Sequence, residues 1–185
     1  LFRSWKEIQS PVIFSEIYDG EIYDARKEIF DENGKVYAEI ILKAKKTKFT
    51  EKPKAKIISR ISPRVTAKER YKATLIKTPN GETVRDFGKE ITGWVEISDF
   101  LTRGEKLTLT YGEILQNGNF YRDNLRTAKS TYCYTYDGDN RLIRPHFTFF
   151  GFRYVKVEGA KIDKNTLDNL VGVSVRSEMA QTGRI

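Results

Sequence analysis

The sequence is poor in the residues that most often build catalytic and metal sites. It contains a single cysteine, Cys133, and a single histidine, His146. One cysteine excludes an internal disulfide and a thiolate metal cluster, and one histidine excludes a histidine-rich metal site. Cys133 lies among tyrosines in a strand-like context, which favours a small buried side chain over a nucleophile. The aromatic surroundings of His146 likewise favour packing or a hydrogen bond over catalysis. We predict no metal site and no cofactor.

Long apolar runs are also absent. No stretch of about 18 apolar residues occurs, so we expect no membrane-spanning helix and no membrane partner. The sequence begins at Leu1 without a basic-then-apolar leader, so no signal peptide is visible and the cellular compartment stays open. Apolar residues make up 39% of the 185 residues, which is enough for one sizeable core and argues against disorder.

Acidic residues are too few to balance the basic ones, and the net charge is +8. Much of this excess is crowded into one segment that contains Lys43, Lys45, Lys46, Lys48, Lys52, Lys54 and Lys56. Such a run is typical of a solvated edge or linker. The tyrosines lie on a different segment, and no RNP-like motif is present. We therefore expect no nucleic-acid partner.

The sequence is rich in short apolar alternations separated by turns. The central one, Arg144–Glu158, reads R-P-H-F-T-F-F-G-F-R-Y-V-K-V-E. Its alternate positions give two largely apolar faces, with Phe147, Phe149, Val155 and Val157 on one and Thr148, Phe150, Phe152, Tyr154 and Lys156 on the other. This pattern predicts the central strand of a sandwich, with Gly151 marking a bulge or a close neighbour.

Further strands are expected at 70–77, 83–87, 93–97, 107–111, 132–136 and 171–175. Turn sequences separate them, among them Tyr18–Gly20, Asp31–Gly34, Thr78–Gly81 and Gln116–Asn119. Only Lys164–Leu170 suggests a helical turn. We predict an all-β fold, a jelly-roll or concanavalin-like antiparallel β-sandwich with little helix.

Two kinds of carbohydrate chemistry fit the composition. Glycoside hydrolysis needs two carboxyl groups, and the candidates by residue type are Asp19, Glu21, Asp24, Glu113, Asp123 and Glu158. No spacing singles out a pair among them. Sugar binding needs a flat aromatic platform, which Tyr132, Tyr134 and Tyr136 would form on one strand face. Core packing and turn capping explain the same residues equally well.

An ordered set of motifs resembles the front half of bacterial α-L-rhamnosidases. Tyr18–Arg26 looks like the family's Y-D-G-E-x-Y-D-A-R, and Asp86–Gly88 followed by Gly93–Val95 looks like its D-F-G and G-W-V pair. Tyr111–Glu113 resembles Y-A-E. Asn124–Arg126 resembles the start of N-L-R-x-A. The remaining matches are Phe147–Tyr154, similar to F-T-Y-H-G-F-R-Y, and Ser177–Gly183, similar to the junction before the family's barrel.

The sequence departs from this pattern at two places. Phe150 stands where the family usually has histidine, and Lys89-Glu90 replaces the usual Q-N after D-F-G. The resemblance implies that an inverting hydrolysis of terminal α-L-rhamnose is carried by acidic residues on an (α/α)6 barrel. These 185 positions stop before that barrel, so no catalytic residue is expected here.

The resemblance also implies a division of the chain. Residues 1–56 would be the C-terminal part of the family's N-terminal β domain plus a lysine-rich connector, 57–176 the concanavalin-like β-sandwich, and 177–185 the start of the linker. The expected partner is the catalytic barrel of the same parent chain. Its interface candidates are Asn124, Arg126 and Arg153, because the loop 120–128 is polar and irregular. A stand-alone carbohydrate-binding module that takes rhamnose-containing glycans is the alternative.

Overall fold

The structure, a computed structural model, describes residues 6–30, 33, 35, 42, 44–48, 51, 54–98, 101–139, 142–159, 168–180 and 182–183. Its first half contains β1 (Lys6–Glu7), β2 (Val12–Glu16), β3 (Gly20–Asp24), the 3₁₀ turn η1 (Ala25–Lys27), β4 (Lys45–Lys46), β5 (Val65–Lys72), β6 (Thr74–Lys77) and β7 (Thr83–Ser98). Its second half contains β8 (Lys106–Gly112), β9 (Ile114–Gln116), β10 (Asn119–Tyr121), the 3₁₀ turn η2 (Asp123–Leu125), β11 (Thr131–Thr135), β12 (Leu142–Ile143), β13 (Phe150–Gly159) and β14 (Leu170–Ser177). The all-β prediction with little helix is confirmed.

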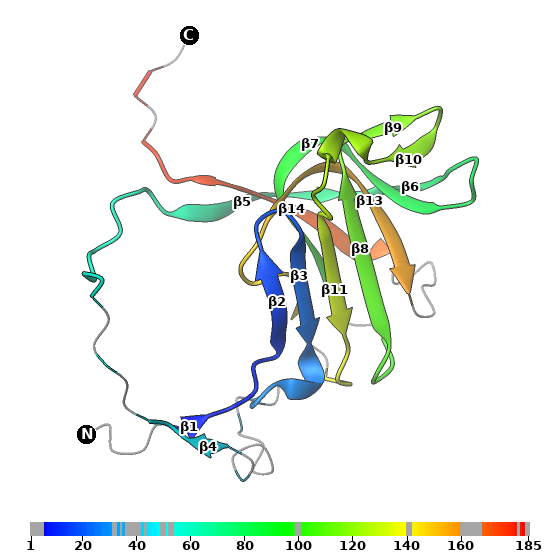
Figure 1. The fold of residues 1–185 in the computed structure, drawn as a ribbon. Coiled ribbons are helices and arrows are strands. Elements are labelled where there is room, and N and C mark those ends of the chain that lie inside the picture. Colours follow the sequence, from blue (N-terminus) through cyan, green and yellow to red (C-terminus); the bar gives the residue numbers. More distant parts are fainter. Residues whose placement is uncertain are drawn as a thin grey trace.

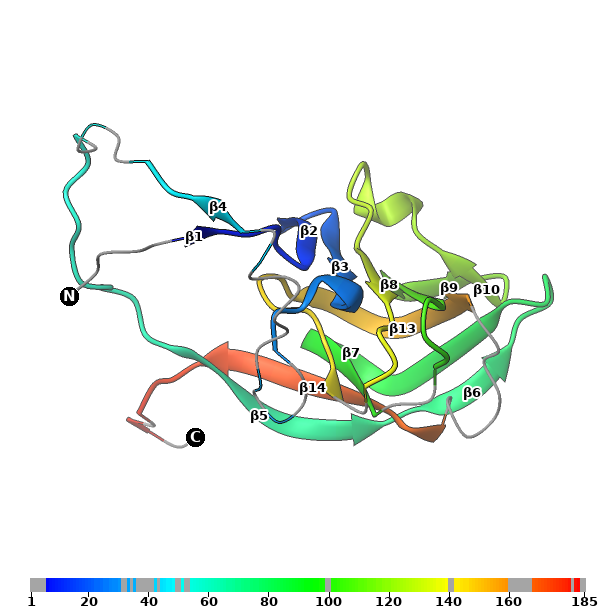
Figure 2. The ribbon, with the colours of Figure 1, turned by 90° about the horizontal axis from the view of Figure 1, so that it is seen from below.

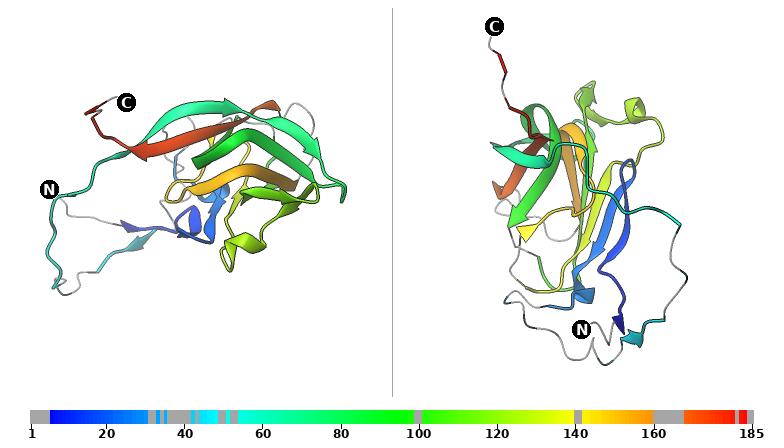
Figure 3. Two further views of the ribbon diagram at one scale, coloured as in Figure 1. Left: turned by 90° about the horizontal axis from the view of Figure 1, so that it is seen from above. Right: turned by 90° about the vertical axis from the view of Figure 1, so that its left-hand side faces the viewer.

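One ten-stranded sheet dominates the fold, in the order β2-β3-β11-β8-β13-β7-β14-β5, with β6 and β12 also pairing with β7. Its pairs are antiparallel except for β3 and β11, which run parallel. The sheet curls on itself, so strands from its two ends face each other across the interior (Figures 1 and 3). The short pairs β1–β4 and β9–β10 lie outside this sheet.

The core lies inside the curl and is rich in aromatic rings. It takes Tyr23 from one end of the sheet and Leu170 from the other, so both halves share one cluster. Near the middle, Tyr111 stacks on Phe150 with ring centroids 3.9 Å apart and meets Phe152 edge-on at 4.9 Å. Such ring pairs stabilise the core beyond the area that they bury.

The two predicted faces of the central strand are partly wrong. Phe147 and Phe149 precede β13 and are 75% and 39% exposed, whereas Val155 and Val157 are buried with Phe150 and Phe152 in the core. The reason is a register shift between Phe152 and Tyr154 against β7. A bulge exchanges the two faces of a strand, so the simple alternation does not continue past Arg153.

Several predicted turns are confirmed. Gly81 donates its N–H to the carbonyl of Thr78 at 2.8 Å, closing the β6–β7 hairpin. Asn117 and Gly118 both have positive φ, as a two-residue hairpin turn between β9 and β10 requires. The expected turn at 31–34 and helical turn at 164–170 lie largely outside the described residues.

The first strands are not separate from the rest of the sheet. β2 and β3 belong to the predicted segment 1–56, yet β3 pairs with β11. The two segments therefore share one sheet, and the division at residue 56 stays a prediction.

Gly20 opens β3 at the point where this strand meets β11. Its φ is +106°, and a Cβ added there would lie 1.9 Å from the carbonyl oxygen of Thr131. We expect Gly20→Ala to lower the free energy of unfolding by about 3 kcal/mol or more, because strain and a backbone clash act together. Gly81→Ala is the control, since Gly81 also has positive φ but no atom within 4 Å of the added Cβ. Urea unfolding of both variants measures the difference, and equal losses would contradict the close approach.

Candidate functional site

The D-F-G motif forms a bulge in the middle of the sheet. Between the pairs Asp86–Tyr154 and Ile91–Phe152, β7 has four residues, 87–90, opposite Arg153 alone. Gly88 adopts φ +80° and donates its N–H to Oδ1 of Asp86 at 2.7 Å. Phe87 points into the core, edge-on to Phe152. The bulge thus leaves Glu90 on the surface, beside β13.

Arg153 joins this bulge to the G-F-R-Y motif. Its Nε and Nη2 donate to the two carboxylate oxygens of Asp86, at 2.9 and 3.0 Å. This bidentate geometry is the strong form of an arginine–carboxylate pair. The hydrogen bonds from Arg153 hold the pKa of Asp86 below its ordinary value, although partial burial acts the other way.

Two further carboxyl groups face each other over Gly151. A Cβ on Gly151 would lie 3.7 Å from Oε1 of Glu90 and 3.8 Å from Oε1 of Glu113. Partial burial, together with the negative charge of Glu113, raises the pKa of Glu90 to about 7, while the charge of Arg153 opposes this rise. Glu90 is therefore divided between its neutral and charged forms near neutral pH.

Asn124 completes the cluster from η2. Its Nδ2 donates to Oε2 of Glu113 at 2.7 Å. Glu113 follows β8 directly, and the ring of Phe120 on β10 packs where a Cβ of Gly112 would lie. We call the set Asp86, Glu90, Glu113, Asn124, Gly151 and Arg153 the Gly151 surface. It unites polar residues of four motifs that the sequence showed only as separate matches.

Two of the three predicted interface residues thus lie in the Gly151 surface, namely Asn124 and Arg153. Arg126 follows η2 with φ +58° and an exposed side chain, which has no hydrogen bond or ion pair to a described residue. Sequence reasoning missed Asp86 and Glu90 as site residues. The one feature of the sequence that could have indicated Glu90 is the dipeptide Lys89-Glu90, which replaces the family's usual Q-N after D-F-G.

The predicted tyrosine platform lies inside the core. Tyr132, Tyr134 and Tyr136 are only 0%, 2% and 2% exposed. Tyr132 donates its hydroxyl to the carbonyl of Arg144, and Tyr134 stacks on Tyr23 at 5.6 Å. A sugar would reach these rings only if neighbouring residues moved. Sugar binding by these tyrosines stays a prediction, and their burial does not support it.

Among the other candidate carboxylates, Asp19 and Glu21 line one cavity beside β3, and several have a basic partner of their own. Asp19 pairs with Lys129 and Asp24 with Arg26, while Asp123 begins η2. Glu158 pairs with Lys156 on the same strand. Within the described ranges, no three His, Cys, Asp or Glu side chains form a group that could hold a metal ion. The described helical residues also include no segment long and apolar enough to cross a membrane.

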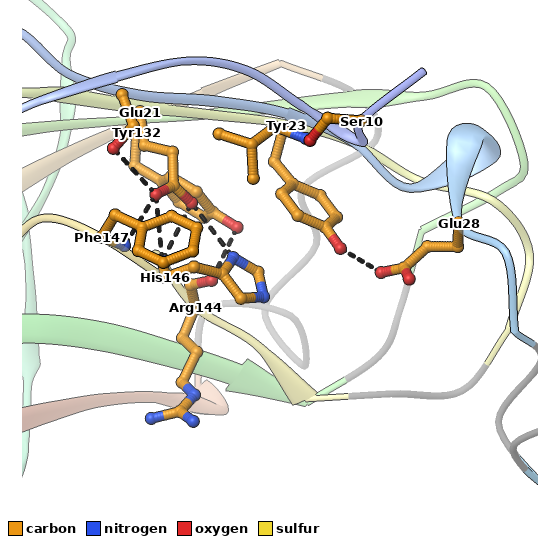
Figure 4. A network of polar contacts seen from close by, with 10 residues as sticks. Ser10, Glu21, Tyr23, Glu28, Tyr132, Arg144, His146 and Phe147 are labelled. Atoms are coloured by element: carbon orange, nitrogen blue, oxygen red, sulfur yellow. Dashed lines mark hydrogen bonds and ion pairs between the residues drawn. The ribbon is translucent and has the colours of Figure 1, made fainter. Parts of the chain in front are cut away.

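Glu21 makes a second polar cluster, and it lies in the core (Figure 4). Its carboxylate accepts the backbone N–H groups of His146 and Phe147, each at 2.9 Å, and lies 3.1 Å from Nδ1 of His146. Ser15 also donates its hydroxyl to it at 3.2 Å. Burial raises the pKa of Glu21, but the hydrogen bonds from His146 and Phe147 outweigh burial, and the pKa lies below its ordinary value.

The fold and the site define an all-β domain whose motif residues gather on one polar surface and in one buried carboxylate cluster. The chain belongs to the bacterial α-L-rhamnosidases: the family's concanavalin-like domain matches residues 76–176, and the α-L-rhamnosidase N-terminal domain matches residues 3–69. The concanavalin-like part of the fold prediction is thereby confirmed.

Relatives with this name align over nearly the whole chain. An α-L-rhamnosidase of Formosa agariphila is 31% identical over 98% of this chain, and one of Alteromonas sp. is 30% identical over 94%. The crystal structure of the Aspergillus terreus enzyme superposes with a TM-score of 0.79 and 31% identity over 95% of this chain. That of the Streptomyces avermitilis enzyme, complexed with L-rhamnose, gives 0.76 and 26% over 91%.

Each of these proteins is much longer than the aligned region. The chain spans 20% of the Formosa relative, 19% of the Alteromonas relative and 20% of the Aspergillus structure. It is therefore the N-terminal β-domain region of the family, about a fifth of a full-length enzyme.

We expect Glu21→Gln to lower the free energy of unfolding at pH 7 by about 3 kcal/mol, since charge-assisted hydrogen bonds are lost in the core. The lowered pKa sets the pH dependence. The ionised carboxylate stabilises the fold above the unfolded-state pKa of about 4.3, and this contribution is lost as the pH falls through the lower folded-state pKa. Urea unfolding from pH 7 to pH 3 should show the difference between wild type and variant shrinking. The exposed Glu7→Gln is the control, and a constant difference would contradict the charged form of Glu21.

Glu90 should give the opposite pH dependence. Its folded-state pKa of about 7 exceeds the ordinary value, so the folded protein binds the extra proton and loses stability as the pH rises from about 4.5 to 7. We expect Glu90→Gln to remove this loss and to be more stable than wild type at pH 8. Chemical unfolding at pH 5 and pH 8 measures the effect, with the exposed Glu178→Gln as the control. A Glu90→Gln profile parallel to that of wild type would contradict the raised pKa of Glu90.

Proposed function

We propose that this chain is the non-catalytic β-sandwich support of a larger α-L-rhamnosidase, which hydrolyses terminal α-L-rhamnose by an inverting mechanism on a separate (α/α)6 barrel. The observation that carries this proposal is the Gly151 surface. Four motifs that are far apart in the sequence place Asp86, Glu90, Glu113, Asn124 and Arg153 side by side on one exposed area. None of these side chains is needed to fill the core.

The chemistry of the Gly151 surface suits docking. Asp86 and Arg153 neutralise each other through two hydrogen bonds, so this pair keeps a fixed geometry without leaving a lone charge. Asn124 uses one donor for Glu113 and has a second donor and an acceptor left for a partner. Glu90 takes up a proton near pH 7, which lowers the cost of moving its carboxyl group out of water. Arg126, two residues after Asn124, adds an exposed cation to the same loop.

The same surface offers little for hydrolysis by this chain alone. Glu90 is exposed, and neither Glu90 nor Glu113 lines either of two cavities, one of about 560 Å³ near β1–β4 and one of about 500 Å³ beside β3. Asn124 already occupies one oxygen of Glu113. Glycoside hydrolysis needs a site that surrounds the scissile bond between two carboxyl groups, and these observations favour a supporting role instead.

The proposed separation of support from catalysis is tested with the 185-residue chain and its full-length parent. We expect the parent to release the aglycone from an aryl α-L-rhamnoside and the chain alone to release none. Calorimetric titration of the chain with millimolar L-rhamnose should give a flat trace, because the tyrosines are buried. Turnover by the chain that Glu90→Gln abolishes would overturn the proposal, and saturable heat of binding would support the carbohydrate-binding alternative.

Docking through the Gly151 surface is tested by Asn124→Ala and Arg126→Ala in the full-length parent. Each should lower the temperature of half-inactivation by about 2–4 °C, which corresponds to roughly 1 kcal/mol of lost interaction. Because both side chains are exposed, the same changes should leave the unfolding midpoint of the 185-residue chain nearly unchanged. Arg103→Ala, an exposed arginine between β7 and β8, is the control. Equal effects in the parent and in the chain alone would show that these residues act within the β domain only.

A further inference from the structure

A cavity of about 500 Å³ lies beside β3, where β2 forms the edge of the sheet. Figures 2 and 3 show β2 and β3 on the side of the molecule opposite β5 and β14. The floor of the cavity is apolar and consists of Phe14, Ile22 and Cys133, which are register partners on β2, β3 and β11. Because Tyr132 and Tyr134 point into the core, this row lies on the outer face of the sheet. An open apolar floor in a cavity of this size is typical of a small-ligand site.

Arg122 lines the same cavity and is half-buried. Its Nη2 donates to the backbone carbonyls of Ala128, at 3.2 Å, and of Lys129. Its Nε is buried without a hydrogen-bond partner, and its Nη1 makes no hydrogen bond to a described residue. Burial lowers the pKa of Arg122, and no neighbouring carboxylate raises it again. A half-buried cation without a counter-ion is costly, so the cavity favours an anionic ligand.

The other charged groups of the cavity are already engaged. Asp19 accepts the backbone N–H of Lys129 at 3.1 Å and lies 3.0 Å from the ammonium group of the same residue. The side chain of Glu21 is fully buried, and its carboxylate accepts the N–H groups of His146 and Phe147. Among the cations of the lining that the structure describes, Arg122 therefore lacks a carboxylate partner, whereas Lys129 has one.

Hydrolysis inside this cavity would need one carboxyl group that stays protonated. Hydrogen bonds from Lys129 lower the pKa of Asp19. Burial raises the pKa of Glu21, but the hydrogen bonds from His146 and Phe147 outweigh burial and leave it below its ordinary value. Both groups are charged near neutral pH, so neither is available as an acid. The cavity is suited to binding a ligand rather than to cleaving a bond.

Polar groups beside the apolar floor suit a ligand that also carries hydroxyl groups. Thr131 donates its hydroxyl to the carbonyl of Lys129 at 2.6 Å, so its oxygen is left to accept a hydrogen bond. The carboxylate of Asp19 has further acceptor sites, and the ammonium group of Lys129 has further donors. A sugar ring presents C–H groups to an aromatic side chain and hydroxyl groups at its edge. A carboxylate on that ring would supply the anion that Arg122 lacks.

We propose that the cavity beside β3 binds an acidic sugar unit, a sugar whose ring carries a carboxylate. The carboxylate accepts from Nη1 of Arg122, the C–H face of the ring lies on Phe14 and Ile22, and ring hydroxyls reach Asp19 and Thr131. This binding site is separate from the Gly151 surface, and it does not depend on docking there or on the absence of catalysis in this chain.

The class of ligand is tested by calorimetric titration of the 185-residue chain with D-glucuronate and with D-glucose, which differ only at carbon 6. We expect D-glucuronate to bind about tenfold more tightly or better, since the carboxylate adds a charge-assisted hydrogen bond. Acetate is the third probe. Equal affinity for acetate and D-glucuronate would show an anion site only and overturn the proposal, as would the absence of D-glucuronate binding. Loss of this binding in the full-length parent would show that another part of the parent covers the cavity, with the same consequence.

Ile22→Glu and Ile22→Gln are a matched pair of variants on the cavity floor. Both remove a side chain that is 44% exposed, but only glutamate places a negative charge beside the carboxylate of the ligand. We expect Ile22→Glu to bind D-glucuronate about tenfold more weakly than Ile22→Gln, because like charges repel. Their unfolding midpoints show that both variants fold. Equal affinities of the two folded variants would contradict binding in this cavity.

Arg122→Gln tests the cation itself. We expect this variant to bind D-glucuronate no more tightly than D-glucose, while Arg103→Gln, an exposed arginine between β7 and β8, keeps the preference for D-glucuronate. Arg122→Lys restores the charge and should recover part of that preference, even if the loop 122–129 is held less firmly. A full preference in Arg122→Gln would overturn the proposal. Loss of docking through Asn124 and Arg126 would leave all of these titrations unchanged, so the two proposals fail independently.

Discussion

The carboxylate of Glu21 is the interaction on which the curl of the sheet depends. A buried carboxylate is costly unless hydrogen bonds replace its water, and two backbone N–H groups, the His146 ring and Ser15 supply them here. Glu21 lies at one end of the sheet, while His146 and Phe147 lead into the central strand β13. The bond spans 125 residues of sequence, so it fixes the first strands against the middle of the fold. The motif around Glu21 and the motif before Gly151 are therefore parts of one structural unit.

The bulge at 87–90 fixes the arrangement of the Gly151 surface. The core needs Phe87 and Phe152 to meet, and the extra residues of β7 allow this contact while the ladder continues on both sides. The extra length is turned outward, which brings Glu90 to Gly151, while Asp86, the register partner of Tyr154, stays within hydrogen-bond distance of Arg153. Packing inside the sheet and the polar surface outside it thus have the same local cause. A change in the bulge would alter both.

Local patterns located extended segments and turns but not the faces or all strand limits. The expected strand 70–77 is divided between β5 and β6, and the expected strands 83–87 and 93–97 are both parts of β7. Alternation correctly indicated β8, β11 and β14, and the turn residues at Thr78–Gly81 and Gln116–Asn119 marked two hairpins. The face of Phe147 and Phe149 was wrong because the register shift in β13 is caused by β7, which is distant in sequence. The prediction and the structure both place Tyr132, Tyr134 and Tyr136 on one strand face. Only the curl of the sheet turns this face toward the core. Glu90 likewise comes near Glu113 only because β13 lies between β7 and β8. A single sequence does not show this strand order.

The protonation of Glu90 connects the surface to the chemistry of whatever covers it. A partner that buries Glu90 against apolar atoms favours the neutral carboxyl group, and docking then takes up a proton near pH 7. A partner that presents lysine or arginine favours the charged form, and docking then releases a proton. Arg153 already acts on Glu90 within this chain, where its charge opposes the rise in the pKa of Glu90, so a cationic partner would add a second positive charge. The sign of the proton exchange on assembly therefore distinguishes an apolar from a cationic neighbour, independently of how tightly the two parts bind.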